Sequence, residues 1–84
     1  MARYFVTQDD PHEYPPFSRG GSYRVWDELT PEPIREISWY EFRGAPVDDG
    51  GITLSQDQAR TQAYSIMNSL TGQMESAEAY RRRK

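Results

Sequence analysis

The chain has 84 residues with no cysteine and one histidine, which excludes disulfides, thiolate metal sites and a His-rich zinc site within one chain. Its formal net charge is −3, but residues 81–84 are Arg-Arg-Arg-Lys, and residues 1–80 carry 13 acidic groups against six basic ones. This acidic body argues against nonspecific binding to a nucleic-acid backbone, which requires clustered Lys and Arg.

Three strands are predicted in the first half of the chain, from short segments rich in β-forming residues. They cover residues 2–7, 22–28 and 34–43. Residues 8–21, with three prolines and two glycines, are predicted as a loop, and Thr30 to Pro33 as the connection before the third strand. Residues 44–51 form a second predicted loop, and residues 52–54 could add a short fourth strand.

One long helix is predicted in the second half of the chain, where several start signals coincide. Ser55 and Gln58 have the spacing of a capping box, in which each side chain satisfies a free backbone N–H of the first turn. Asp57 adds a negative charge at the positive end of the helix dipole. Leu54 and Ala59 stand at the positions of a hydrophobic staple.

The predicted helix has one apolar face and a defined end. Apolar side chains recur at one-face spacing at Ala59, Ala63, Ile66, Met67 and Leu70. Gly72 is placed to stop the helix, and residues 73–84 could form a short second helix at the C-terminus.

These elements predict an α+β fold, in which three or four antiparallel strands are packed by one C-terminal amphipathic helix. A single small domain is expected over residues 1–80, followed by a basic tail at 81–84. We find neither an apolar run near the ~20 residues of a membrane span nor a signal-peptide segment. With cysteine also absent, we expect a cytoplasmic protein and no membrane partner.

Both faces of the predicted sheet carry large apolar side chains, since alternate residues of a strand share a face. Tyr4 and Val6 lie opposite Phe5, Tyr23 and Val25 lie opposite Trp26, and Ile37 and Trp39 lie opposite Ile34, Tyr40 and Phe42. One helix covers only one face. The second face must be covered by the Tyr14-Pro-Pro-Phe17 loop, by the C-terminal segment or by another molecule.

Phe5, Trp26, Trp39 and Tyr40 are the strongest candidates for protein interaction, because Trp and Tyr dominate interface hot spots. We expect Phe5, Trp26 and Trp39 to share the second face. A symmetric homodimer would bury them and stabilise a small domain that lacks disulfides. The alternative is an ordinary two-sided core, filled by the protein's own loops.

Two acidic segments are weaker candidates. The segment from Asp9 to Glu13 brings three carboxylates next to His12, which could ligate a hard cation or supply an acid–base pair. No second cluster completes the ligand set, so we favour a solvated loop. The segment from Asp48 to Gly51 lacks the oxygens of a calcium loop and is predicted as a turn. We assign no catalytic, cofactor-binding or metal-binding residues and expect a protein that is not an enzyme.

Arg81, Arg82, Arg83 and Lys84 could contact nucleic acid or an acidic partner. The alternative is a solubilising tail that complements the C-terminal end of a helix dipole. We favour this alternative, because specific recognition of nucleic acid needs base contacts as well as phosphate contacts.

Residues 23–71 resemble small β-β-α proteins common in actinobacteria and their phages. The likeness lies in Tyr23-Arg24-Val25-Trp26-Asp27, the turn region after it, and the Ile52-Thr53-Leu54-Ser55 segment that opens a helix ending Asn68-Ser69-Leu70. The strand-then-helix order is also similar to the arm-binding domain of tyrosine integrases and to the end of double-stranded-RNA-binding domains. The latter carry a Lys-rich helix start that touches phosphate, where this chain has Ser55-Gln56-Asp57-Gln58.

From these observations we expect a small non-enzymatic protein-interaction module without a cofactor. The resemblance implies a phage-encoded protein that binds or inhibits a host or phage protein in the host cytoplasm. The acidic body also permits mimicry of DNA, which would block a nucleic-acid-binding protein. The alternative is a nucleic-acid-binding accessory protein that uses the Arg-rich C-terminus.

Overall fold

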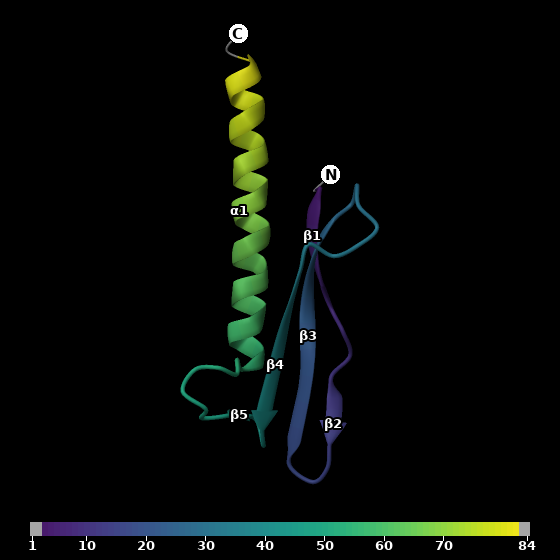
Figure 1. Ribbon diagram of the computed structural model, residues 1–84, viewed down its shortest axis with the longest axis vertical. Coiled ribbons are helices and arrows are strands. Elements are labelled where there is room, and N and C mark those ends of the chain that lie inside the picture. The colour runs from purple at the N-terminus through teal and green to yellow at the C-terminus, as the bar shows by residue number, and fades with distance from the viewer. Residues whose placement is uncertain (1–2, 83–84) are drawn as a thin grey trace.

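The computed structural model describes residues 3–82, which form two layers, a sheet and a helix laid along one face of it (Figure 1). The strands are β1 (Tyr4–Gln8), β2 (His12–Tyr14), β3 (Ser18–Asp27), β4 (Arg35–Phe42) and β5 (Ala45–Pro46), and the helix is α1 (Gln56–Arg82). The predicted α+β arrangement, an antiparallel sheet packed by one C-terminal helix, is confirmed.

The central strand of the sheet is β3. The strand order is β1-β3-β4-β5, every pair is antiparallel, and β2 pairs with the first part of β3 beyond the end of β1. In the β3–β4 register, Tyr23 lies opposite Ile37 and Gly21 lies opposite Trp39. Since residues that face each other across an antiparallel pair point to the same side of the sheet, this register places Ile37 and Trp39 on the face that carries Tyr23.

The core lies on the inner face of the sheet, the face toward α1. Its buried apolar residues are Tyr23, Val25, Ile37, Trp39, Ala59 and Ala63. Val6, Leu54, Ile66, Met67 and Leu70 are partly buried against them. The helix face predicted from apolar spacing is therefore the face that packs on the sheet, although Leu70 is partly rather than fully buried.

The start of α1 confirms the predicted capping box. The backbone N–H of Ser55 donates to Oε1 of Gln58 at 2.9 Å, and the backbone N–H of Gln58 donates to Oγ of Ser55 at 3.3 Å. Each side chain thereby satisfies a backbone donor that the first turn leaves free.

The end of α1 differs from the prediction. The helix continues through Gly72 to Arg82, so the predicted stop is wrong, and residues 73–82 extend α1 instead of forming a second helix. Glycine inside a helix is unfavourable by ~0.5–1 kcal/mol relative to alanine, an amount that packing of Leu70 and Met74 on either side of it can outweigh. In Figure 1 the last turns of α1 project beyond the sheet. Arg83 and Lys84 lie outside the described residues.

Two strand segments occur where a loop was predicted, since β2 and the first four residues of β3 fall within residues 8–21. Gly20 and Gly21 belong to β3 because neighbouring groups lie against their backbone. A Cβ at Gly21 would lie 3.0 Å from the indole of Trp39, and a Cβ at Gly20 would lie 3.1 Å from the carbonyl oxygen of Trp39. This glycine pair marks close packing rather than a turn.

The connection from β4 to α1 also differs from the prediction. Arg43 and Gly44 have φ of 52° and 80°, as in a type I′ turn, and they join β4 to β5. Residues 52–54 form no strand: Ile52 is 85% exposed, and the carbonyl of Leu54 accepts one hydrogen bond from the N–H of Tyr40 at 2.9 Å. The short fourth strand predicted there is replaced by β5, earlier in the chain.

Candidate functional site: the outer face of the sheet

The outer face of the sheet points away from α1, which packs on the inner face against β1, β3 and β4. Strand alternation and register place one set of side chains on the outer face: Phe5, Thr7, Asp9, His12, Tyr14, Ser22, Arg24, Trp26, Glu36, Ser38, Tyr40 and Phe42, with Phe17 beside Phe42. No element of residues 3–82 covers this face (Figure 1). Five aromatic side chains on it, Phe5, Tyr14, Phe17, Tyr40 and Phe42, are 37–51% exposed.

One end of the outer face carries a stacked pair, Phe5 and Trp26, here called the Trp26 pair. Their ring centroids lie 6.2 Å apart with an interplanar angle of 10°, and the two residues are direct partners across β1 and β3. The indole N–H of Trp26 donates to Oγ1 of Thr7 at 2.7 Å. This hydrogen bond holds the indole beside Phe5, and Trp26 is half-buried there.

The other end of the outer face carries the Tyr40 cluster, which consists of Tyr14, Phe17, Tyr40 and Phe42. Tyr14 and Tyr40 have ring centroids 6.1 Å apart, and Phe17 and Phe42 meet edge to face at 5.9 Å. The guanidinium of Arg43 lies 3.6 Å from the centroid of the Phe17 ring. The rings contact one another, yet each of the four stays 37–51% exposed.

Between the two aromatic ends lies a polar centre of Asp9, Ser22, Arg24, Glu36 and Ser38. Nε of Arg24 donates to Oε2 of Glu36 at 2.8 Å, and its Nη2 lies 3.2 Å from Oδ2 of Asp9. The hydrogen bond to Glu36, with the charge of Asp9, raises the pKa of Arg24 above its ordinary value. Ser22 Oγ also donates to Asp9 at 2.9 Å. One guanidinium is thus shared by two carboxylates, and the polar centre is net acidic.

The outer face brings together three of the four predicted interaction residues. Phe5 and Trp26 form its first end, and Tyr40 belongs to its second end. The expectation that Trp39 shares this face is wrong: Trp39 points toward α1 and is 3% exposed, because its register partner Gly21 lies on the inner face. Sequence reasoning did not count Phe42 as a site residue, although its alternation with Tyr40 was the signal that could have found it.

The Tyr14-Pro-Pro-Phe17 loop covers the outer face only in part. Tyr14 and Phe17 reach Tyr40 and Phe42 and remain exposed themselves. The C-terminal segment does not reach this face, because it continues α1 on the other side of the sheet (Figure 1). Within residues 3–82, neither the Tyr14-Pro-Pro-Phe17 loop nor the C-terminal segment covers the whole outer face.

The two acidic segments have structural partners. Asp9 binds Ser22 and Arg24 as described, and residues 12–14 form β2. Asp49 accepts hydrogen bonds from the backbone N–H of Thr53 at 2.9 Å and from its hydroxyl, which lowers the pKa of the carboxyl and closes the turn after β5. Within residues 3–82, no group of three or more His, Asp or Glu side chains is placed to hold a metal ion.

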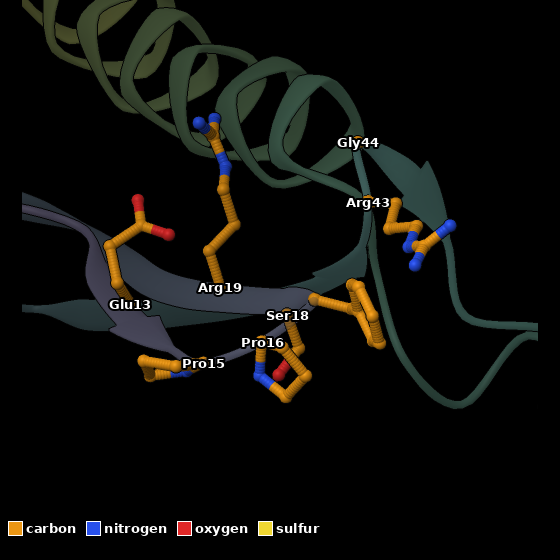
Figure 2. Close-up of a pocket in the computed structure, with 8 residues that line it drawn as sticks. Glu13, Pro15, Pro16, Ser18, Arg19, Arg43 and Gly44 are labelled. Carbon is orange, nitrogen blue, oxygen red and sulfur yellow. The ribbon is translucent and has the colours of Figure 1, made fainter.

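A hollow of about 380 Å³ at the β2–β3 turn is lined by two arginines but does not form an anion site. In Figure 2 the guanidinium of Arg19 points toward α1, whereas that of Arg43 points away from it. Arg19 donates to Gln56 and lies 3.6 Å from Glu41, and Arg43 stacks on Phe17. The two cations do not converge on a common ligand position.

Comparison with known proteins gives no match to a family model, to a curated protein or to a solved structure. Within the described residues, α1 is the long helix, and it is not apolar enough to cross a membrane. The chemistry of the outer face therefore carries the functional argument on its own.

Proposed function

We propose that this protein is a non-enzymatic protein-interaction module that binds through the outer face of its sheet. The observation that carries the proposal is the aromatic surface at both ends of this face, where Phe5, Tyr14, Phe17, Tyr40 and Phe42 each expose 37–51% of their area. Aromatic residues on a flat, open surface are typical of binding hot spots.

The polar centre supports a protein partner over a nucleic acid at this face. Arg24 is already paired with Asp9 and Glu36, so the centre offers phosphate a net negative surface. In one form of the proposal, a host or phage protein occupies the outer face; in the other, a second copy of the chain does. The alternative is a nucleic-acid-binding accessory protein that uses Arg81, Arg82, Arg83 and Lys84 instead of the outer face.

A pair of variants tests the proposal. Phe5→Ser combined with Phe42→Ser removes one aromatic side chain from each end of the outer face, while Tyr64→Ser removes an aromatic of similar exposure, 43%, from α1. Each protein is immobilised and the retained chains, including copies of itself, are identified by mass spectrometry. Circular dichroism and urea melts verify that each variant is folded.

We expect the parent and Tyr64→Ser to retain the same chain and the double variant to lose it. Retention of that chain by the folded double variant would show that the outer face does not bind, and the proposal would fail.

A further inference from the structure

We infer that the outer face of the sheet is covered by a second copy of this chain, in a symmetric face-to-face dimer. The inference rests on the proposed function and names the partner.

The exposed aromatic area matches the apolar part of a stable interface. Five aromatic side chains are 37–51% exposed, which corresponds to roughly 450 Å² of aromatic surface if each has about 200 Å² in total. A standard interface buries about 800 Å² per partner, of which about 56–65% is apolar. The outer face of one copy therefore supplies the apolar area that one side of such a dimer needs.

The order of groups along the outer face suits a two-fold axis. The Trp26 pair lies at one end, the polar centre in the middle and the Tyr40 cluster at the other end. A two-fold axis that runs between the two sheets, perpendicular to the strands, places the Trp26 pair of each copy on the Tyr40 cluster of the other. The same operation places polar centre on polar centre, so that aromatic surface meets aromatic surface at both ends of the interface.

The polar centres can meet without leaving a cation unpaired. Each Arg24 brings carboxylates of its own chain with it, at 2.8 Å from Glu36 and 3.2 Å from Asp9. Ser22 and Ser38 are direct partners across β3 and β4 and add hydroxyl groups. Each centre keeps one negative charge in excess, so in the dimer interfacial water must separate and hydrate the two centres, as in ordinary wet interfaces.

The core of one chain is small, which favours a second copy over an isolated domain. In the described part of the chain, six apolar residues are fully or nearly buried, and Val25 is the largest side chain with no exposed surface. Small domains without disulfides or metals often gain stability by oligomerisation. Stacking two sheets would add a second apolar layer on the side of β3 that α1 leaves open.

Sedimentation equilibrium of the full chain, from micromolar to millimolar concentration, tests the inference. We expect a dimer for the parent and for Tyr64→Ser, and a folded monomer for Phe5→Ser with Phe42→Ser. Losing two hot-spot aromatics per copy should raise the dissociation constant on the order of a thousandfold, enough to keep a micromolar dimer monomeric below millimolar concentration. If the double variant fails to fold, Phe42→Glu alone repeats the test at a side chain that is 51% exposed.

A parent chain that is monomeric over the whole range would overturn the inference, as would a dimer that the folded double variant retains. These results are distinct from failure of the proposed function. A monomeric parent that retains a different protein, and loses it in the double variant, would leave the interaction module standing and remove only the second copy.

Discussion

The two faces of the sheet are built from the same kind of residues but differ in what covers them. Trp39 on the inner face lies under α1 and is 3% exposed, whereas Trp26 on the outer face is only partly sheltered, by its contacts with Phe5 and Thr7. The chain's own helix buries Trp39, whereas the aromatic side chains of the outer face stay partly or largely exposed. Substitutions on the inner face should therefore affect folding, and those on the outer face should affect the binding proposed above.

The largest difference between the faces is expected for the two tryptophans. Trp39→Ala should destabilise the fold by ~3–5 kcal/mol, because it empties a buried site between the sheet and α1. Trp26→Ala should have a much smaller effect in dilute solution, since its indole is partly exposed already. Urea denaturation of both variants at micromolar concentration measures the difference, and equal losses would contradict the comparison.

A smaller effect on the inner side is expected at the start of α1. Ser55→Ala should lower the free energy of unfolding by ~0.5–2 kcal/mol, because the backbone N–H of Gln58 loses its acceptor at 3.3 Å. The effect should appear as a shift of the denaturation midpoint without a change in m-value. An unchanged midpoint would mean that the capping box does not support the helix in solution.

The ion pairs of the two faces should respond differently to acid. Arg3 donates two hydrogen bonds to Asp27, at 3.1 and 3.0 Å. These hydrogen bonds, together with one from the backbone N–H of Leu29, lower the pKa of the Asp27 carboxyl below its ordinary value of 3.8. Its stabilising contribution is present above the unfolded-state pKa and is lost as pH falls through the lower folded-state pKa. Asp27→Asn should therefore lower the free energy of unfolding at neutral pH. Below about pH 4, the free energy of unfolding of this variant should fall less steeply with pH than that of the parent.

The matched control for Asp27→Asn is Glu36→Gln on the outer face. The carboxylate of Glu36 pairs with Arg24 at an exposed position, where ion pairs contribute little to stability. Urea melts between neutral and acid pH should show a clear change in slope for Asp27→Asn and almost none for Glu36→Gln. The opposite order would contradict the assignment of the stabilising pair to the buried side.

The smallest effect is expected at the end of α1, beyond both faces. Deletion of residues 81–84 should leave the melting temperature nearly unchanged, because the core side chains of α1 lie between Ala59 and Leu70. Thermal unfolding followed by circular dichroism measures this. Loss of a binding partner without unfolding would identify the basic tail as a binding element and would extend the account beyond the sheet.

Local patterns in the sequence predicted much of the fold. The spacing of Ser55 and Gln58 predicted the start of α1, and the apolar spacing predicted its packed face. Alternation within a strand predicted that Trp39 and Tyr40 point to opposite sides of the sheet. These features depend on neighbours within a few residues, which a sequence displays directly.

The errors concern features that depend on distant residues. Trp26 shares its face of the sheet with Tyr40 and not with Trp39, because of the register between β3 and β4. Alternation within one strand does not fix that register. Glycine at position 21 predicts a loop from the sequence. Its place in a strand follows from its close contact with the indole of Trp39, which is distant in the sequence. Gly72 has the residue type of a helix stop, but α1 continues through it to Arg82.

The most direct test of the account measures how accessible each tryptophan is to a soluble quencher. Trp39→Phe leaves Trp26 as the only fluorophore, and Trp26→Phe leaves Trp39. We expect acrylamide to quench Trp26 readily at micromolar concentration and weakly at millimolar concentration, where the second copy covers the outer face. Trp39 should be quenched weakly at both concentrations. Equal quenching of Trp26 at both concentrations would contradict a covered outer face, and ready quenching of Trp39 would contradict the assignment of the two faces.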